Sequence, residues 1–231
     1  MELTHFVLVT GPFVGRSSML DTARALREAG AMVTEPDPHV VHAEDLPTLE
    51  DWANSLLPAI PAPPPIIVGY GAGTVLAAWL ASRIDAAGLI LMDGEIPPDA
   101  GPCPILPEPV TVQLRKLAKG DRLPKWSDWW PEELAEPLGK AALRRMHPEL
   151  RDILAGEERE FPIDWLDQRL DLDRWSDVPT GYLRLSDFYR DAAQEAAARG
   201  WPVEEVEGSH LHPAMMGNDT AGALMAVAGA F

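Results

Sequence analysis

The residue types most suggestive of chemistry surround a short glycine-rich turn. The run Ile66–Gly73 (IIVGYGAG) places a β-branched strand, a tight turn and the start of an apolar helix in succession. A nucleophile elbow needs this order, with small residues beside its central position, because the turn brings strand and helix close together. Gly69 and Gly73 meet that need, but the central position, which is normally serine, is Gly71. The turn is therefore predicted to lack an attacking hydroxyl.

The elements around this turn alternate between strands and helices. We expect strands at 6–9, 31–34, 66–68, 89–92, 182–185 and 203–206, and helices at about 17–29, 46–57, 74–82, 188–199 and 220–230. This alternation predicts an α/β fold with a mostly parallel sheet of about six strands and helices on both faces.

One long segment, residues 97–178, breaks the alternation. It holds several tryptophans and prolines and a helical pattern from Pro131 to about Leu154. We expect a helical, Trp-rich cap insertion lying over the sheet. The predicted domains are a core of residues 1–96 and 179–231 and a cap of residues 97–178.

Four segments in this order resemble the α/β-hydrolase family, and more narrowly its small esterase and hydroxynitrile-lyase-like branch. FVLVTGPFVGRSSMLDTARALREAGAMVTEPD is similar to that branch's opening strand, oxyanion loop, helix and second strand. IIVGYGAGTVLAAWLAS resembles the elbow and its helix, and GLILMDGEIPP resembles the strand before the cap. GYLRLSDFYRDAAQEAAARGWPVEEVEGSHLHPAM resembles the acid strand and the histidine loop. The resemblance covers nearly all of the chain outside the cap and implies an α/β-hydrolase fold.

The resemblance also implies an acid and a histidine. Asp187 stands where the family carries its acid, and His210 stands where it carries its histidine. An Asp–His pair holds the imidazole in one tautomer and raises its basicity, which suits a general base. His212 is an alternative pocket histidine, and Asp93 and Asp191 are weaker alternative acids. Asp187 also fits the N-cap of the following helix.

The departures from the family pattern decide what chemistry we expect. Gly71 replaces the serine, and Pro12 falls at or beside the position whose backbone N–H usually forms half of the oxyanion hole. With the alignment shifted by one residue, Phe13 supplies that donor, and Ala72 supplies the other. Losing one donor typically costs about 10²–10³ in rate, and losing the nucleophile costs on the order of 10⁶. Both departures point away from acyl transfer.

Three aromatic residues are candidate substrate contacts. Tyr70 flanks the elbow, and Trp129 and Trp130 belong to the expected cap. Each is either a packing residue or part of a binding wall. Cys103 is expected to be an inert cap residue. No group of histidines and carboxylates has metal-ligand spacing, so we expect neither a metal nor a cofactor.

Composition limits the partners. A net charge of −17 repels phosphate backbones and anionic lipid, which disfavours nucleic acid and membrane surfaces. No apolar run reaches about 18 residues, and the first residues lack the pattern of a signal peptide. A single cysteine fits a reducing compartment. We expect a cytoplasmic protein with a small-molecule substrate; a homodimer is compatible with these features.

The resulting functional prediction is an α/β-hydrolase-like enzyme without acyl-enzyme chemistry. His210 moves a proton on a small apolar carbonyl compound, in an elimination, epimerisation, cyclisation or C–C cleavage of a biosynthetic pathway. One alternative is a pseudo-hydrolase that binds a ligand or partner without catalysis. The other is an ester or thioester hydrolase in which a serine at position 71 has been mutated to glycine.

Overall fold

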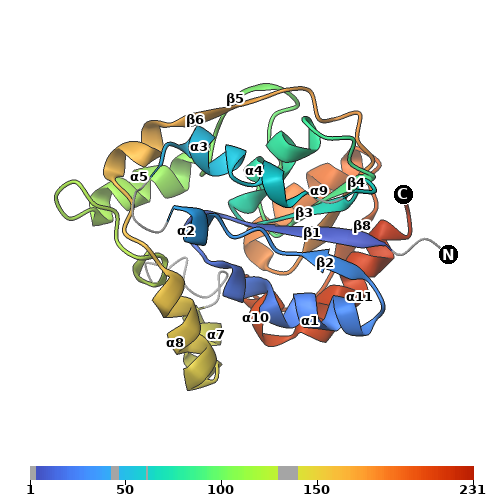
Figure 1. Ribbon diagram of the computed structural model, residues 1–231. Helices are drawn as coiled ribbons and strands as arrows, with labels where there is room; N and C mark the ends of the chain where they lie inside the picture. Colours follow the sequence, from blue (N-terminus) through green and yellow to red (C-terminus); the bar gives the residue numbers. More distant parts are fainter. Residues whose placement is uncertain (1–3, 43–46, 61, 130–139) are drawn as a thin grey trace.

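A central parallel sheet lies between two layers of helices (Figure 1). The computed structural model describes residues 4–42, 47–60, 62–129 and 140–231. The sheet has six strands in the order β2-β1-β3-β4-β7-β8, and every neighbouring pair is parallel. Their bounds are β1 (His5–Thr10), β2 (Met32–Thr34), β3 (Ile66–Tyr70), β4 (Gly88–Met92), β7 (Thr180–Arg184) and β8 (Val203–Glu205). The predicted fold class and all six expected strands are confirmed.

Helices cover both faces of this sheet (Figure 1). One layer holds α1 (Leu20–Glu28), α10 (His212–Met215) and α11 (Gly217–Ala228), and the other holds α3 (Leu49–Asn54), α4 (Gly73–Ala81) and α9 (Arg190–Ala198). Short 3₁₀ turns lie at Arg16–Met19 (η1), Leu57–Ala59 (η2), Trp126–Asp128 (η3), Ile163–Asp167 (η4) and Asp187–Tyr189 (η5). A further short helix, α2 (Pro38–Val41), occupies part of the segment expected to be loop, because proline is well suited to the first helical turn.

The core follows from the period-two alternation of the strands. In β1, Val7 and Val9 face one apolar cluster while Phe6 and Leu8 face the other, and all four are buried. β3 and β4 are buried along their whole lengths, as expected for central strands of a parallel sheet covered on both faces. None of the helices in the described ranges is both long and apolar enough to span a membrane.

The segment expected to form a cap contains more than helices. β5 (Gly101–Pro104) pairs antiparallel with β6 (Arg169–Leu172), and α5 (Glu108–Leu117), α7 (Lys140–Arg145) and α8 (Pro148–Glu157) lie between them in the chain. The segment expected to be a helical insertion therefore also contains a two-stranded antiparallel sheet, which the sequence pattern conceals because the two prolines of β5 lack N–H groups and β5 pairs along one side only. The domain boundaries at residues 97 and 178 stay a prediction.

The helical pattern expected from Pro131 to Leu154 is divided. Residues 131–139 of it lie outside the described residues, and the rest forms α7 and α8 rather than one helix. The interruption falls at His147, because the residue before a proline is pushed out of the helical region and Pro148 then begins α8.

The strand register aligns the carboxyl ends of β1, β3, β4 and β7 at one edge of the sheet. Tyr70 pairs with Thr10 on one side and with Met92 on the other, and Met92 pairs with Leu183. These residues end or nearly end their strands, so the loops that follow them meet at the carboxyl edge of the sheet. Ligand sites in open α/β sheets lie at this edge.

Candidate active site

Gly71 occupies a sharp turn between β3 and α4. Its φ is +57°, a left-handed conformation that glycine adopts without steric cost. A Cβ on Gly69 would lie 2.6 Å from Cβ of Ala77, and one on Gly73 would lie 2.4 Å from the carbonyl oxygen of Val9. The small residues on both sides of Gly71 are therefore required by the close approach of strand and helix, as the sequence predicts.

His210 points at the empty face of Gly71. A Cβ added at position 71 would lie 2.9 Å from Nε2 of His210 and 3.0 Å from its Cε1. The imidazole is 5% exposed, and the ring of Tyr70 stacks on it with centroids 4.7 Å apart. The Tyr70 hydroxyl donates a hydrogen bond to the main-chain carbonyl of His210, which ties the histidine loop to the elbow.

The other ring nitrogen of His210 is held by Asp93. Nδ1 lies 2.8 Å from Oδ2 of Asp93, whose side chain is fully buried. The same carboxylate accepts hydrogen bonds from the backbone N–H groups of Leu185 and Ser186, at 2.9 and 2.8 Å, and from the Ser186 hydroxyl. A carboxylate with this many donors accepts from Nδ1–H, which leaves the Nε2 lone pair directed at Gly71.

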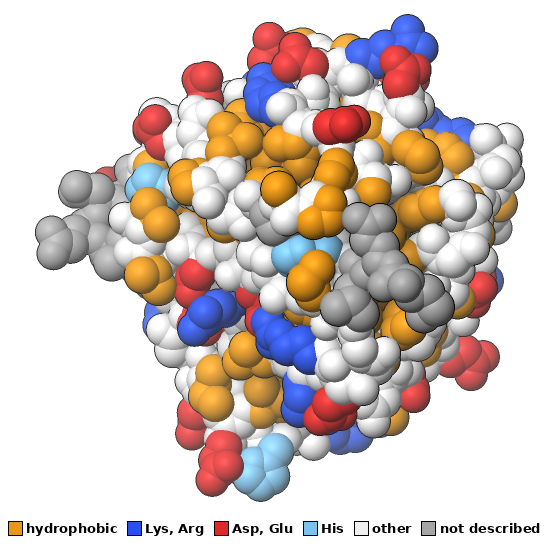
Figure 2. Space-filling model, turned by 45° about the vertical axis from the view of Figure 1, so that its right-hand side comes forward, with side chains coloured by type: hydrophobic (Ala, Val, Ile, Leu, Met, Phe, Trp, Pro, Cys, Tyr) orange, Lys and Arg blue, Asp and Glu red, His pale blue; other side chains and the backbone are white. Residues whose placement is uncertain are grey.

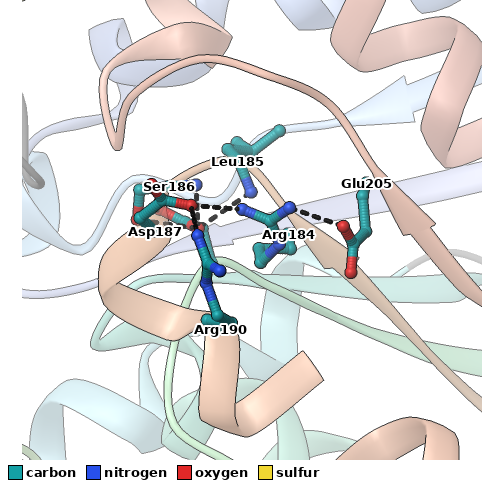
Figure 3. A network of polar contacts seen from close by, with 7 residues as sticks. Arg184, Leu185, Ser186, Asp187, Arg190 and Glu205 are labelled. Atoms are coloured by element: carbon teal, nitrogen blue, oxygen red, sulfur yellow. Dashed lines mark hydrogen bonds and ion pairs between the residues drawn. The ribbon is translucent and has the colours of Figure 1, made fainter. Parts of the chain in front are cut away.

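The prediction that Asp187 orients His210 is wrong. Asp187 is exposed and forms ion pairs with Arg184 at 3.1 Å and with Arg190 at 2.7 Å (Figure 3). The hydrogen bond from Arg190 is the main cause that lowers the pKa of its carboxyl. The register explains the outcome, because Asp93 directly follows β4 at the sheet edge, whereas Asp187 lies beyond β7 in a turn that leads away to α9.

The alternative histidine does not reach the site. His212 begins α10, and its Nε2 lies 3.8 Å from Oδ2 of Asp219 in α11. Burial is the main cause that lowers the pKa of His212. Asp191, the other alternative acid, lies in the first turn of α9.

A cavity opens in front of His210 and Gly71. It encloses about 520 Å³ of empty space, including its mouth, and most of its lining is apolar. Its walls are formed by Gly11, Phe13, Val14, Tyr70, Gly71, Ala72, Leu106, Pro107, Val110, Trp126, Trp129, Phe188, Tyr189 and His210. Figure 2 shows hydrophobic side chains gathered on one face of the molecule, with charged side chains around them.

Two of the three residues expected at the oxyanion positions line the cavity, and one does not. Phe13 and Ala72 line the cavity, whereas Pro12 does not. Within the described chain, neither the N–H of Phe13 nor that of Ala72 donates a backbone or side-chain hydrogen bond. The geometry therefore favours the alignment in which Phe13, rather than Pro12, stands at the first donor position.

Two tryptophans form much of the outer wall. Trp126 and Trp129 both line the cavity, and the ring of Trp129 lies edge-on to that of Phe13 with centroids 4.6 Å apart. The indole N–H of Trp129 donates to the carbonyl of Pro124 at 2.7 Å. Trp130, the other tryptophan proposed for the substrate wall, lies outside the described residues.

Three consecutive side chains, Glu157, Glu158 and Arg159, attach this wall to the rest of the molecule. Glu157 accepts from the backbone N–H of Ser17, at 3.0 Å, and from its hydroxyl, close to the loop that contains Phe13. Glu158 accepts from the N–H and hydroxyl of Ser127, between the two pocket tryptophans, at 3.1 and 2.8 Å. Arg159 donates to main-chain carbonyls of α2 and the residue after it, at 2.7 and 2.6 Å. We call residues 157–159 the anchor segment.

A second cavity adjoins the first behind the elbow. It encloses about 630 Å³ of empty space, including its mouth, and shares Gly71, Ala72, Leu106, Pro107 and Tyr189 with the first. Its remaining walls come from α4, from the segment between β4 and β5, from β5 itself and from the residue after β5, namely Thr74, Val75, Glu95, Ile96, Pro97, Pro98, Cys103, Pro104 and Ile105. Burial raises the pKa of the Cys103 thiol to about 11, which agrees with the expectation of an unreactive cysteine.

Sequence reasoning missed most of these wall residues. Leu106, Val110 and Tyr189 carry no recognisable motif, since an apolar residue in a loop is as compatible with packing as with a ligand wall. The position of Asp93 in the sequence did indicate a site residue. Asp93 directly follows the buried strand β4, as Gly71 directly follows the buried strand β3. No three His, Cys, Asp or Glu side chains within the described ranges are grouped so that they could hold a metal ion.

Comparison with known proteins agrees with this architecture. A family model described as "Alpha/beta hydrolase family" matches residues 7–224. No curated protein sequence matches the chain. Among solved structures, an extracellular alpha/beta-hydrolase from a Paenibacillus species is similar at 16% identity and a TM-score of 0.72, over 97% of this chain and 98% of that one. Its description notes structural and functional homology to tobacco Salicylic Acid Binding Protein 2.

Two further solved structures share the fold. A pyrethroid hydrolase from Sphingobium faniae JZ-2 is similar at 19% identity and a TM-score of 0.69, over 99% of this chain and 98% of that one. Tomato Methylketone Synthase I, complexed with 2-tridecanone, is similar at 16% identity and a TM-score of 0.69, over 100% of both chains. A variant of the same tomato protein is complexed with beta-ketoheptanoate.

Proposed function

The chain belongs to the alpha/beta hydrolase family, and on that premise we propose that it is an enzyme that transfers protons without forming an acyl-enzyme. His210 is the base, Asp93 is the residue that orients it, and the substrate is a small, largely apolar carbonyl compound. The observation that carries the proposal is the approach of Nε2 of His210 to a residue without a side chain, 2.9 Å from where a Cβ would lie.

The proposed reaction passes through an enolate. His210 takes a proton from the carbon next to the substrate carbonyl, or from a hydroxyl one carbon further away when a C–C bond is to break. Its neutral Nε2 is available for this step because Asp93 holds the proton on Nδ1. Elimination, epimerisation and cyclisation proceed from the enolate that loss of the carbon-bound proton forms. In C–C cleavage the deprotonated hydroxyl becomes a new carbonyl, and the breaking C–C bond releases the enolate. None of these reactions needs a nucleophile at position 71.

The backbone N–H groups of Phe13 and Ala72 are the proposed donors to the enolate oxygen. Both residues line the cavity with Gly71 and His210, and both donors are unused within the described chain. A preformed pair of donors in a site that excludes water stabilises a developing oxyanion strongly, about 10²–10³ in rate for each donor.

The apolar walls support an apolar substrate. Trp126, Trp129 and Phe13 offer aromatic surface, and none of the described residues that line the cavity is a lysine or arginine that could bind an anionic group. Ketone and β-keto acid ligands bound to tomato Methylketone Synthase I are consistent with a carbonyl substrate in this fold.

The test is the exchange of α-hydrogens of a simple ketone with solvent. The protein is incubated with 2-hexanone or 5-nonanone in D₂O, and deuterium incorporation is followed by NMR. We expect exchange above the buffer rate, reduced about 10²–10⁴-fold in His210→Gln, because that is the usual contribution of a general base. His212→Gln is the matched control and is expected to exchange at the wild-type rate.

Two outcomes would contradict the proposal. Exchange that is unchanged in His210→Gln would remove this histidine from the mechanism. Binding of the ketones, measured by calorimetry, without any exchange by the wild-type protein would favour the non-catalytic ligand-binding alternative.

A further inference from the structure

The second cavity meets the first at the reaction centre rather than at its rim. The two share Gly71 and Ala72, which are the elbow and one of the proposed oxyanion donors. They also share Tyr189, whose ring centroid lies 5.8 Å from that of His210. A carbonyl group placed at the elbow therefore has open space on two sides.

The far part of the second cavity differs from the aromatic cavity in its chemistry. Its walls are mostly aliphatic and proline side chains, among them Val75, Ile96 and Ile105. Glu95 lies at its exposed rim, and the described residues provide no hydrogen bond or ion pair to its carboxylate. Burial is the main cause that raises the pKa of Glu95, and repulsion from Glu195 and Asp191 adds to it.

These charges determine what the second cavity can accept. Among the described residues that line this cavity, Glu95 is the only one with a charged side chain, so a second carboxylate placed there would meet repulsion and no lysine or arginine. An uncharged alkyl arm meets only apolar walls and gains from leaving water.

We infer that the substrate carries two uncharged carbon arms that meet at its reacting carbonyl, with one arm in the aromatic cavity and the other in the cavity between Gly71 and Cys103. This inference rests on the proposed function, because it takes the reacting group to be a carbonyl at the elbow. It makes the substrate an internal ketone or a comparable two-armed carbonyl compound. Carboxylic acids and carbonyl compounds with an anionic second arm are excluded.

Matched ketones test this without any turnover. 2-Hexanone and 5-nonanone both carry one butyl arm, and their second arms are a methyl and a butyl group, respectively. Affinities are measured by calorimetry on the whole protein. The two-arm arrangement predicts at least tenfold tighter binding of 5-nonanone, because three further methylenes are buried.

The single cysteine reports occupancy of the second cavity directly. Cys103 is 4% exposed and lies in the wall of that cavity, so a reagent reaches its thiol by way of the same space. Alkylation by N-ethylmaleimide is followed by mass spectrometry at pH 9, since the raised pKa makes the reaction slow at neutral pH. Saturating 5-nonanone is expected to slow alkylation at least fivefold, and saturating 2-hexanone less than twofold.

Filling variants separate the two cavities. Cys103→Phe fills the second cavity and is expected to reduce the affinity for 5-nonanone at least tenfold while that for 2-hexanone changes less than threefold. Val110→Phe, in the wall of the aromatic cavity alone, is expected to weaken both ketones alike. The alkylation experiment uses the unmodified chain, so the inference stays testable even where Cys103→Phe fails to fold.

A keto diacid tests the exclusion of anionic arms. 5-Oxononanedioate has the carbon skeleton of 5-nonanone with a carboxylate at each end, so either arm placed in the second cavity is anionic, and it is expected not to protect Cys103. Glu95→Gln is expected to increase its affinity, whereas Glu204→Gln, on β8, is the control and is expected to leave it unchanged.

The outcomes distinguish this inference from the proposed function. Equal affinity of the two ketones, or alkylation of Cys103 that 5-nonanone does not slow, overturns the two-arm arrangement alone. Failure of both ketones to bind overturns the carbonyl substrate class and this inference with it. Tight binding and protection of Cys103 by 5-oxononanedioate overturns the exclusion of anionic arms.

Discussion

The two walls of the aromatic cavity are built in different ways. The inner wall, with Gly71 and His210, lies at the carboxyl edge of the sheet, where Gly71 directly follows β3 and His210 lies in the loop after β8. Behind this wall, Asp93 holds the imidazole and is itself fixed by main-chain hydrogen bonds. The outer wall, with Trp126 and Trp129, is attached through long side chains of the anchor segment. On the proposed function, the inner wall performs the chemistry and the outer wall influences which substrates enter.

The largest expected difference between the walls is in stability. Asp93→Ala leaves the N–H groups of Leu185 and Ser186 and the Nδ1–H of His210 without their acceptor in a buried site. At about 1–3 kcal/mol for each buried group left unpaired, the free energy of unfolding is expected to fall by about 3 kcal/mol or more. Urea unfolding measures it. Asp187→Ala, on the exposed side, is expected to change it by less than about 0.5 kcal/mol.

The contact of the anchor segment with α2 predicts a pH dependence of stability. Burial is the main cause that lowers the pKa of His39 from 6.5 to about 4, and the charge of Arg159 adds to it. The unfolded chain therefore binds a proton first as the pH falls. Stability is fully present above pH 6.5 and is lost progressively down to about pH 4, by at most about 3 kcal/mol.

Comparison of wild type and His39→Gln by urea unfolding at pH 7, 5.5 and 4 isolates this contribution. The variant is expected to lose less stability over this interval, because it lacks the titrating group. Equal pH profiles for the two proteins would show that His39 is not the source. Arg159→Gln is expected to reduce the pH dependence partly, since it removes one of the two causes that lower this pKa.

A smaller effect is expected at the elbow itself. Gly71→Ala places a methyl group at a φ of +57° and 2.9 Å from Nε2 of His210. The backbone conformation costs about 1–2 kcal/mol, measured as a lowered Tm. Exchange of ketone α-hydrogens is expected to fall at least tenfold, because the methyl group occupies the space in front of the base.

Gly71→Ser tests the alternative that the protein is an ester hydrolase whose serine has been lost. Its Cβ meets the same imidazole, so the histidine must move before a serine hydroxyl can be activated. We expect no hydrolysis of p-nitrophenyl butyrate above the wild-type level. Efficient hydrolysis by this variant, with a wild-type Tm, would support a lost serine enzyme instead.

The smallest expected effect is in the anchor segment. Glu158→Gln keeps one acceptor for Ser127 but removes the charge from a hydrogen-bonded pair. We expect a loss of about 1 kcal/mol in stability and a several-fold rise in KM for the ketone, with kcat for exchange unchanged. A fall in kcat with KM unchanged would place this anchor in the chemistry rather than in binding.

Sequence patterns predict the sheet and the elbow because both depend on local signals. Buried β-branched runs mark β1, β3 and β4, and close packing of backbone against backbone demands Gly69 and Gly73. His210 lies in the loop that follows β8, where the resemblance expects the family's histidine, and its imidazole faces Gly71.

The acid and the outer wall depend on three-dimensional register instead. Choosing Asp93 over Asp187 requires knowing that Met92 pairs with Leu183, which no local pattern reveals. The pairing of β5 with β6 joins segments about 70 residues apart and is concealed by prolines. Glu157 and Ser17 are 140 residues apart in the chain, so no local sequence pattern predicts the hydrogen bonds between them.

The most direct measurement compares two aspartate variants in the exchange of 5-nonanone α-hydrogens with D₂O. Asp93→Asn is expected to lower the rate about 10²–10⁴-fold, because the imidazole loses the group that fixes its tautomer. Asp187→Asn is expected to remain within twofold of wild type. A wild-type rate in Asp93→Asn, or an equal loss in both variants, would contradict the assignment of Asp93 and His210 as the proton-transfer pair.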